Sequence, residues 1–404
     1  MYKKIKYCRV CANRKFSKII DLGNQPLANS LTKKPVNQKK IPLEIIRCNK
    51  CSLIQLTATV NPKKLFTNYL WVTGTSEEVK KYRNYFVSKL NKDFKNKKKK
   101  ILEIASNDGF FLKKFKNNGH KVLGVDPARN IAYKASKSGI KTIPEFFNEN
   151  THLKIKKHHF IPNIIICRNV IPHVENIKNI IKGIYNLISD DGTIYIEFHY
   201  AENLSKNLHY DYIYHEHIFY YSFKSINYLL KKFNLFAYDY FESPISGGSI
   251  VLKIKKEKIK ISTKLKKLIN YEKKIGINTS KYWSNFKSKC IRHKTKLVSI
   301  IKKLNVSKIK IYGYGASARS STLINYCNFS NKNFHGIFDK NPLKRNLYTA
   351  GSKIKILPVT NKLIKKADCI VIFAWNFEKE IMKYLKSIKF KKKIISVLPR
   401  ITIN

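Results

Sequence analysis

Acidic residues, glycine, proline and methionine are scarce in this chain of 404 residues. It has 25 Asp and Glu against 81 Lys and Arg, with 15 Gly, 12 Pro and 2 Met, and its formal net charge is +56. Lysines run along the whole sequence, and Ile, Asn, Tyr and Phe are also abundant, a profile that AT-rich codons produce. We therefore interpret the charge mainly as compositional bias. An anionic partner, such as nucleic acid or a phosphorylated substrate, is the alternative.

Long apolar runs are also missing. No stretch of 18 apolar residues occurs, which argues against a membrane span, and no apolar segment follows the basic start "MYKKIKYCRV", which argues against a secretory signal. The length predicts two or three domains, and 43% hydrophobic residues suffice for their cores. We expect a cytoplasmic protein without a membrane partner or a specific nucleic-acid partner, as a monomer or a weak homo-oligomer.

Four of the eight cysteines form two CxxC pairs, Cys8 with Cys11 and Cys48 with Cys51. Each pair places two thiolates on one ion, and two pairs complete the tetrahedral sphere that structural Zn²⁺ prefers. A closed sphere of four thiolates leaves no open position for catalysis, so we expect a structural role. A redox pair is the alternative. The other four cysteines occur singly and are typical of small buried hydrophobic residues.

Strand and helix patterns divide the rest of the chain. We predict a zinc-binding module over residues 1–75 and a domain of alternating strands and helices over 76–258. Residues 259–404 are predicted to form a lysine-rich helical connector and a second, smaller α/β domain. The alternation predicts a parallel, doubly wound sheet, whose ligands lie at the carboxyl ends of its strands.

The first strand–turn–helix unit of the middle domain, "ILEIASNDGFFL", ends its strand at Glu103 and continues through Asn107, Asp108 and Gly109. It lacks GxGxxG and GxxxxGK[ST], which argues against a dinucleotide or P-loop site. The next strand ends at Asp126, where a carboxylate can accept from both hydroxyls of a ribose. S-adenosylmethionine, a sulfonium cation with a ribose and an amino acid, fits this pattern. Ordinary turn and cap roles for the two aspartates are the alternative.

The segment "YHEHIFYYS", from Tyr214 to Ser222, places two histidines around a glutamate. A metal site, structural histidines and a proton-transfer site are three interpretations. HEH is not HExxH, and no third ligand is evident nearby, which argues against metal. Imidazole titrates near neutral pH and suits a general base.

The C-terminal domain begins with "IYGYGASA", which gives Gly313-x-Gly315-x-x-Ala318 between a strand and a helix. Alanine at the third position is an accepted variant of the dinucleotide fingerprint, and Asp339 ends the next strand, where a ribose-binding acid would lie. Tight glycines and helix amides accept phosphate oxygens. A glycine-rich turn that serves packing alone is the alternative.

Taken together, these motifs resemble the sugar C-methyltransferases of deoxysugar biosynthesis, which methylate a nucleotide-linked 4-keto sugar. The resemblance covers nearly the whole chain and includes the four cysteines, "EIASNDG", "RNVIPHV", "YHEH", "SGGSI", "GYGASARSSTLINY" and "FDKNPLK". It implies an α/β chain, with a class I Rossmann-like methyltransferase sheet flanked by a small N-terminal zinc module and a second Rossmann-like C-terminal domain. The implied cofactors are S-adenosylmethionine and structural Zn²⁺, and the implied partner is an NDP-sugar.

The resemblance also implies roles for individual residues. His217 would be the general base, with Glu216, Tyr214, His173 and Tyr69 facing the sugar. The implied cofactor contacts are Glu103, Ser106, Asn107, Asp108, Gly109, Asp126, Pro127, Asn169 and Val170. The implied substrate contacts are Gly247, Gly248, Ser249, Gly313, Gly315, Ala318, Arg319, Asn325 and Asp339.

The expected reaction is S-adenosylmethionine-dependent C-methylation, at C3, of an NDP-4-keto-deoxysugar through a base-generated enolate. Arg319 and Ser320 stand where the family usually shows a Lys-Gly pair, and "AGS" (350–352) stands where Pro-Gly-Thr is common, which leaves the nucleotide open.

Two other functions were weighed against this reaction. An RNA-modifying methyltransferase would use the basic surface and the zinc module, but "RNVIPHV" stands where base-methylating enzymes usually have N/D-P-P-Y/F. An NAD-sensing or nucleic-acid-binding protein would leave Glu103, Asp126 and the HEH cluster without a role.

Overall fold

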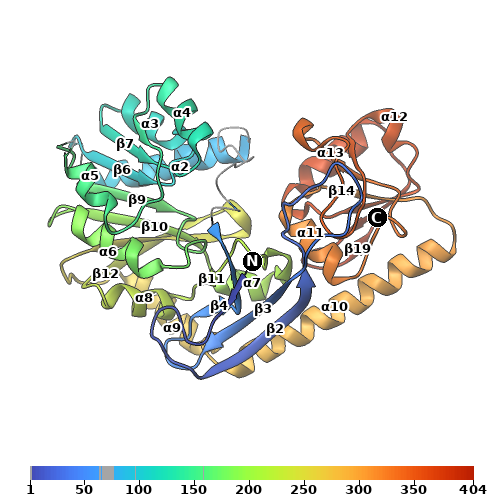
Figure 1. Cartoon of the computed structure of the whole chain (residues 1–404), viewed down its shortest axis with the longest axis horizontal. Helices are drawn as coiled ribbons and strands as arrows, with labels where there is room; N and C mark the ends of the chain where they lie inside the picture. Colours follow the sequence, from blue (N-terminus) through green and yellow to red (C-terminus); the bar gives the residue numbers. More distant parts are fainter. Residues whose placement is uncertain (1, 63–64, 66–76, 96, 158) are drawn as a thin grey trace.

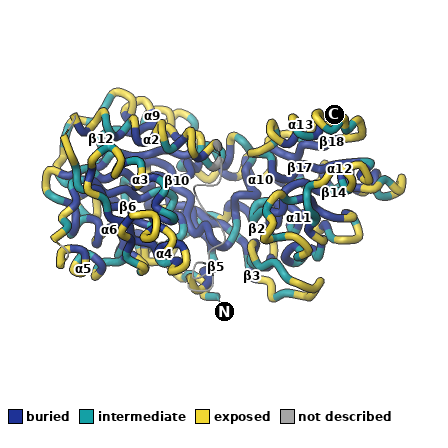
Figure 2. The backbone as a smooth tube through the Cα atoms, turned by 90° about the horizontal axis from the view of Figure 1, so that it is seen from above, coloured by how far each residue is buried: buried dark blue, intermediate teal, exposed yellow. Residues whose placement is uncertain are grey.

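The computed structural model describes residues 2–62, 65, 77–95, 97–157 and 159–404. A large lobe (77–255) and a small lobe (311–404) lie side by side, and the N-terminal module (2–62) and the helix α10 connect them (Figure 1). In both lobes buried strands lie at the centre and exposed segments lie outside (Figure 2). Within the described residues, we find no helix with the length and apolar character that a bilayer crossing requires.

The N-terminal module is built on a four-stranded sheet of order β11-β4-β3-β2. Its strands are β2 Phe16–Gln25, β3 Ile41–Cys48, β4 Ile54–Leu56 and β11 Phe219–Tyr220, and a separate pair joins β1 Tyr2–Lys4 to β5 Ala58–Val60. Strand β11 comes from the large lobe, and it pairs antiparallel with β4 through Phe219–Gln55 and Tyr220–Ile54. The residues that follow the HEH cluster therefore belong to the sheet of the N-terminal module.

The large lobe contains a seven-stranded sheet of order β12-β13-β10-β9-β6-β7-β8. Its strands are β6 Lys100–Ile104, β7 Lys121–Val125, β8 Thr142–Ile143, β9 Ile164–Arg168, β10 Thr193–His199, β12 Phe236–Ser243 and β13 Ser249–Lys255. Its helices are α2 Glu77–Phe94, α3 Phe110–Asn117, α4 Arg129–Lys137, α5 Thr151–Lys157, α6 Ile177–Leu187, α7 Ala201–Lys206 and α8 Phe223–Lys231, with the 3-10 turns η2 Tyr210–Tyr212 and η3 Ile245–Gly247.

The predicted doubly wound sheet is present, but it is not wholly parallel. Strand β13 runs antiparallel to both β10 and β12. The link between β12 and β13 spans only residues 244–248, which is too short for the crossover that parallel neighbours need. The central strand β9 is almost entirely apolar, as expected for a strand covered on both faces. The predicted boundary at residue 258 stays a prediction.

Two helices follow the large lobe, α9 Thr263–Ile275 and α10 Ser280–Val306. Trp283, Phe286, Cys290, Leu297 and Ile301 are buried along α10. Their spacing of three, four and seven residues gives the helix one apolar face. Because α10 also contacts β2, it packs along the N-terminal module on its way to the small lobe (Figure 1).

The small lobe contains a six-stranded sheet of order β16-β15-β14-β17-β18-β19. Five strands are parallel, and β19 pairs antiparallel with β18. The elements are β14 Ile311–Tyr314, α11 Ala318–Tyr326, β15 Ile337–Asp339, η4 Pro342–Lys344, β16 Ile356–Pro358, α12 Asn361–Ile364, β17 Cys369–Ile372, η5 Trp375–Phe377, α13 Glu378–Ser387, β18 Lys393–Ser396 and β19 Thr402–Ile403. The second Rossmann-like domain expected from the sequence is therefore present.

The carboxylate of Glu272 joins α9 to two helices of the large lobe. It lies on α9, is buried, and accepts hydrogen bonds from Tyr200 Oη at 2.9 Å and from the backbone N–H groups of Phe223 and Lys224. The last two groups open α8 and have no partner within that helix. The carboxylate thus caps α8 and ties it to α9 and to the start of α7.

Replacing Glu272 with Ala leaves these buried donors without an acceptor. We expect the free energy of unfolding to fall by about 2–3 kcal/mol. The expected readout is a lower urea midpoint for the transition that contains the large lobe. Glu272→Gln keeps one oxygen acceptor and should lose less. An unchanged midpoint for Glu272→Ala would contradict this role.

Candidate active site and zinc centre

The two CxxC pairs lie in two turns of the same kind. Each turn closes with a hydrogen bond from the backbone N–H four residues on, from Ala12 to the Cys8 carbonyl and from Ser52 to the Cys48 carbonyl. Both closing residues have positive φ, 58° and 62°. The repeated geometry turns the thiols of both pairs toward a common point.

The four thiols meet at distances that suit a single zinc ion. The sulfur atoms of Cys8, Cys11, Cys48 and Cys51 all lie within 4.8 Å of one another, and two pairs are separated by 3.6 and 3.4 Å. A tetrahedron with Zn–S bonds of about 2.3 Å has edges of about 3.8 Å. A hydrogen bond from Cys51 lowers the pKa of Cys8 to about 4, whereas burial raises the pKa of Cys11 to about 11. Four thiolates at these distances repel one another, so a bound cation would stabilise them.

The turn between β6 and α3 contains most of the predicted cofactor residues. Ala105, Asn107 and Gly109 have positive φ values of 54°, 50° and 71°. This backbone bends sharply at the carboxyl end of β6, beside β7 and β9. Asp126 follows β7 directly, and its two oxygens accept from the backbone N–H groups of Asn107 (2.8 Å) and Ala128 (2.9 Å). The carboxylate therefore fixes the turn and keeps lone pairs for a ligand.

The neighbouring predicted residues lie at the same edge of the sheet. Asn169 follows β9 with φ 52° and donates its backbone N–H to the Glu197 carbonyl at 2.8 Å. Ser106 is buried, while Pro127 and Val170 are partly exposed. Among the described residues, the Ser106 hydroxyl and the Asn169 side-chain oxygen have no hydrogen-bond partner. The turn therefore retains polar atoms that a cofactor with a ribose and an amino acid can satisfy.

Glu103 has a different environment from the other predicted cofactor residues. It is fully buried, and its Oε1 accepts from Arg168 Nε at 2.8 Å and from Nη2 at 2.6 Å. The guanidinium of Arg168 lies 3.3 Å from the centre of the Phe111 ring. This ion pair joins β6 to β9 beneath the turn. Sequence reasoning missed Arg168, although its position at the end of β9, two residues before Val170, was a usable signal.

The segment 214–217 forms a turn rather than a strand, closed by the His217 N–H and the Tyr214 carbonyl at 2.9 Å. His215 Nε2 lies 3.3 Å from the Ile41 carbonyl oxygen, in the N-terminal module, and His173 Nδ1 lies 2.8 Å from the Glu216 carbonyl oxygen. His217 Nδ1 instead lies 2.8 Å from the Tyr212 carbonyl oxygen, so the two histidines of the HEH cluster have different partners. Within the described part of the chain, only the four cysteines form a group that could hold a metal.

His217 is buried with its ring held in one orientation. Its Nδ1 donates to the Tyr212 carbonyl oxygen at 2.8 Å, which leaves the lone pair on Nε2. Burial lowers the pKa of His217 well below its ordinary value, and the neighbouring His173 lowers it further. The imidazole is therefore neutral near pH 7, as a general base must be.

Glu216 is buried beside the N-terminal module. Its Oε1 accepts a hydrogen bond of 2.6 Å from Asn29 Nδ2. Burial raises the pKa of Glu216 to about 7, and the Asn29 hydrogen bond opposes this shift. Near neutral pH the carboxyl is partly protonated and can donate a hydrogen bond as well as accept one.

Six rings lie in succession from this turn to the small lobe, and we call them the ring column: His173, His217, Tyr212, His199, His209 and Trp375. Successive ring centres are 4.8, 4.2, 4.2, 6.1 and 4.1 Å apart. Trp375 Nε1 donates to Asp211 Oδ2 at 2.7 Å. Sequence reasoning missed His199, His209, Asp211 and Trp375, although His199 ends β10 and Trp375 begins η5 just after β17.

The predicted substrate residues of "SGGSI" lie against this column. Gly247 has φ 82°, and a Cβ there would approach both His209 and Trp375 to 2.8 Å. Gly248 has φ 106°, and its carbonyl accepts from Asn203 Nδ2 at 2.9 Å. Ser249 pairs with His199 across β13 and β10. These residues shape the junction of the two lobes.

The glycine-rich turn of the small lobe is tightly packed. Gly315 has φ 98°, and a Cβ there would lie 2.4 Å from the Ala374 side chain. Asp339 accepts from the backbone N–H groups of Ala316 (2.9 Å) and Asn341 (2.8 Å), so its carboxylate supports the turn. Gly313 lies within β14.

The other predicted residues of the small lobe lie on α11 or near its end. Arg319 lies in the first turn of α11, beside Ala318, and reaches the Tyr212 and Trp375 rings at 5.2 and 5.1 Å. Asn325 lies at the opposite end of α11, where its amide donates to the Ala350 carbonyl at 3.0 Å. Tyr69, predicted to face the sugar, lies outside the described residues.

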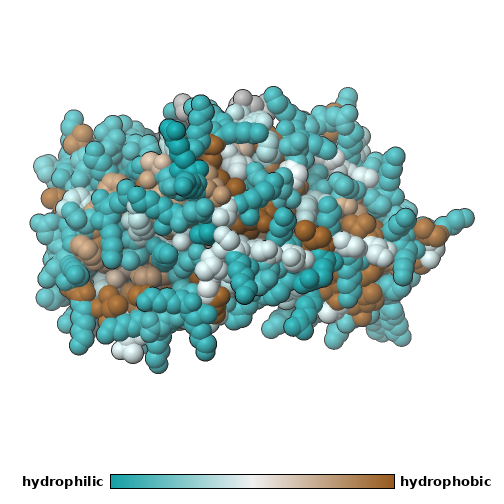
Figure 3. Space-filling view, turned by 90° about the horizontal axis from the view of Figure 1, so that it is seen from below, coloured by the Kyte–Doolittle hydropathy of each residue, from teal (hydrophilic) through white to brown (hydrophobic). Residues whose placement is uncertain are grey.

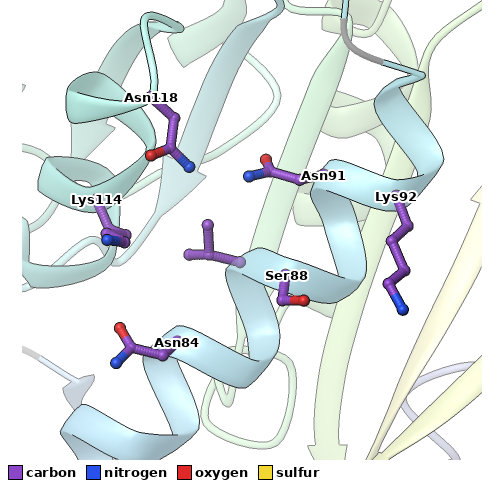
Figure 4. Close-up of a pocket in the computed structure, with 7 residues that line it drawn as sticks. Asn84, Ser88, Asn91, Lys92, Lys114 and Asn118 are labelled. Atoms are coloured by element: carbon purple, nitrogen blue, oxygen red, sulfur yellow. The ribbon is translucent and has the colours of Figure 1, made fainter.

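A groove between α2 and α3, with a volume of about 440 Å³, is separate from this site. Asn91 and Asn118 point toward one another across it (Figure 4). It lies on the helical layer rather than at the strand ends. The face seen in Figure 3 is covered mainly by hydrophilic side chains over both lobes, in keeping with the spread of lysines along the chain.

Family models match three consecutive parts of the chain. Residues 8–66 match "Putative zinc binding domain", residues 77–237 match "Methyltransferase domain", and residues 244–399 match "C-methyltransferase C-terminal domain". The C-methyltransferase NovU of Streptomyces niveus is 26% identical over 389 residues, which cover 94% of this chain and 92% of NovU.

Solved structures are similar over less than half of this chain. The PH0226 protein of Pyrococcus horikoshii OT3 is 14% identical over 48% of this chain and 97% of its own, with a TM-score of 0.36. The plantazolicin methyltransferase BpumL is 17% identical over 43% of this chain and 82% of its own, with a TM-score of 0.34.

The sheet, the strand-end residues and the matched domain define a methyltransferase that uses S-adenosylmethionine. In this chain the methyltransferase domain stands between a zinc-binding domain and a C-methyltransferase C-terminal domain, and these three matches together fit a C-methyltransferase family. The four-cysteine cluster fits the zinc ion of that module. The similarity to NovU covers nearly the whole chain, and NovU is named a C-methyltransferase. This similarity does not favour the RNA-methyltransferase alternative.

Replacing Cys48 with Ser removes one of the four thiolates. We expect the zinc content of the purified protein to fall well below one ion per chain and the thermal midpoint to drop, because zinc binding contributes to folding. Metal analysis and thermal unfolding provide the two readouts. Cys327→Ser, a buried cysteine outside the cluster, is the matched control and should retain the metal. A wild-type protein without zinc would refute the site.

Glu216 should make the stability depend on pH. Its folded pKa of about 7 lies above the ordinary 4.5, so the folded state binds more protons between these values. Stability therefore falls as pH rises through this window. The thermal midpoint of Glu216→Gln, relative to wild type, should rise between pH 4.5 and 8 by the equivalent of at most about 3 kcal/mol. The exposed Glu257→Gln is the control. A constant difference across this range would count against the shifted pKa.

Proposed function

We propose that this enzyme methylates C3 of an NDP-4-keto-deoxysugar through an enolate, with His217 as the general base. The observation that carries the proposal is the orientation of His217, whose bonded Nδ1 leaves Nε2 unprotonated inside a buried site between two lobes. A ring carbon beside a ketone is acidic enough for an imidazole to remove its proton. The family match to C-methyltransferases supports carbon as the acceptor atom.

The turn after β6 and the ends of β7 and β9 would hold S-adenosylmethionine. Asp126 would accept hydrogen bonds from the ribose hydroxyls, and Asn107, Asp108 and Gly109 would offer backbone and side-chain polar groups at the same edge. Asn169 would contact the cofactor from the end of β9. When bound, this cofactor supplies a methyl group carried on a positively charged sulfur.

Residues of this chain would remove the proton and stabilise the negative charge that develops on the substrate. His217 Nε2 takes the proton from C3 as the C–H bond breaks, and the electron pair moves to the ketone oxygen. A partly protonated Glu216, the Tyr214 hydroxyl and His173 would orient the sugar and donate hydrogen bonds to that oxygen. The N-terminal module contributes by holding Glu216 through Asn29. The gain comes largely from orientation, because two reactants are held side by side.

The small lobe would hold the nucleotide. Its glycine-rich turn and the start of α11 offer tight backbone and a helix N-terminus beside Arg319, features that suit phosphate groups. Gly247 and Gly248 would let the sugar and its phosphates approach the backbone closely at the junction of the lobes.

Incubation of the enzyme with methyl-labelled S-adenosylmethionine and a panel of NDP-4-keto sugars tests this function. We expect a product heavier by one methyl group, with the label on C3. Each sugar's NDP-linked 4-hydroxyl counterpart is the matched control, because it has no ketone to stabilise the carbanion. Methylation of that control, or of oxygen, would overturn the enolate route.

Replacing His217 with Ala should lower the rate of methyl transfer by about 10²–10⁴-fold, because the base is lost. Affinity for S-adenosylmethionine should stay within about threefold of wild type, since the proposed cofactor contacts lie elsewhere. In D₂O, wild type should introduce deuterium at C3 of the substrate and the variant should not. Loss of cofactor binding with retained exchange would remove His217 from this role.

A further inference from the structure

We infer that Arg319, His199 and His209 form the subsite that receives the phosphate groups of the substrate. This inference rests on the proposed function, because it assumes that the substrate is a nucleotide sugar. The three side chains come from the two lobes and converge at the ring column. They lie between the turn that contains His217 and the glycine-rich turn of the small lobe.

His199 is the first observation. Its side chain lies at the carboxyl end of β10 and is only 3% exposed, yet within the described residues neither ring nitrogen has a hydrogen-bond partner. Its ring stacks on Tyr212 at 4.2 Å, which fixes the plane of the imidazole. Leaving a buried polar group unsatisfied costs about 1–3 kcal/mol. A ligand that accepts a hydrogen bond from this ring would remove that cost.

His209, which precedes η2, is a second buried histidine with an unpartnered ring nitrogen. It is 3% exposed, stacks on Trp375 at 4.1 Å, and has no partner for Nδ1 among the described residues. Burial, together with the charge of Arg319, lowers the pKa of His209 to about 3. Each neutral imidazole can therefore offer one N–H donor.

Arg319 supplies the positive charge. Its guanidinium lies near the faces of Tyr212 and Trp375, and its Nη1 is buried without a hydrogen-bond partner in the described part of the chain. No described carboxylate lies within 4.0 Å of it as an ion pair. A partly buried guanidinium with an unpartnered buried nitrogen and no ion pair favours an anionic ligand. Its place in the first turn of α11 adds the positive end of that helix.

Asp211 is a buried acid that interacts with Arg319 and must be reconciled with an anion. Its Oδ2 already accepts from Trp375 Nε1 at 2.7 Å. Burial raises the pKa of Asp211 to about 6, so protonation costs little near neutral pH. A sugar hydroxyl would need no cation here. The guanidinium and two imidazole donors therefore favour phosphate oxygens.

The covalent order of the proposed substrate agrees with this placement. A diphosphate lies between the sugar and the nucleoside, and the three residues lie between His217 and the glycine-rich turn. His217 is two steps from His199 along the ring column, through Tyr212. A sugar at His217 with its nucleoside on the small lobe thus brings the phosphates to this point.

Inorganic pyrophosphate, titrated calorimetrically into the full-length protein, tests the subsite without any keto sugar or methyl transfer. Arg319→Gln should weaken its binding at least tenfold, because a charged donor is lost. His199→Phe keeps a ring on Tyr212 but has no donor, and should weaken binding about three- to tenfold. The matched control is His335→Phe, at an exposed histidine of the small lobe, which should bind within twofold of wild type.

His199→Phe should also keep or raise the thermal midpoint, because it removes unpaired buried nitrogens. If it fails to fold, His209→Phe, which retains a ring against Trp375, replaces it. Unchanged pyrophosphate affinity in Arg319→Gln and a histidine variant, or no binding to wild type at millimolar pyrophosphate, would overturn the subsite. If the substitutions weaken pyrophosphate binding but no keto sugar is methylated, the subsite is supported and only the proposed function is refuted.

Discussion

The hydrogen bond between the His217 ring and the Tyr212 carbonyl determines what this site can do, because it decides which ring nitrogen is free to take a proton. A turn without regular structure cannot hold such a ring by itself. The turn is held from three directions, through Ile41 and Asn29 in the N-terminal module and through Thr322 of the small lobe, whose hydroxyl donates to the Ile213 carbonyl at 3.1 Å. The orientation of the His217 ring therefore depends on the packing of all three parts of the chain.

Burial gives this arrangement its chemical character. Desolvation keeps the histidines of the ring column neutral and raises the pKa of Glu216, so the site contains bases without charge and an acid that retains its proton near neutrality. Arg319 then stands out as the cation between the lobes. Neutral rings around His217 and a positive charge farther along the column form a gradient that suits the proposed substrate, which has a ketone at one end and phosphates beyond it.

Much of this could be predicted from local pattern. Some features are determined by patterns of a few neighbouring residues: the CxxC spacing, the polar turn after Glu103 and the glycines around Gly315. The sequence alone therefore indicated the zinc cluster and both sheets. The interactions that depend on distant residues could not be found in the same way. The Glu103–Arg168 pair, the turn at Tyr214–His217 and the stack of His209 on Trp375 all arise where separate elements meet.

The pairing of β4 with β11 has a consequence for how this chain can be divided. A fragment cut to the boundaries of the seven-stranded sheet would carry the imidazole and the cofactor turn, but it would expose Phe219 and Tyr220 as an unpaired edge. It would also lack the side chain that holds Glu216. In such a fragment the turn after β6 would keep its supporting strands, but the turn that contains Glu216 and His217 would lose its contacts with the N-terminal module. The unit that can be moved into another protein as a working catalyst is therefore the whole chain and not its methyltransferase domain.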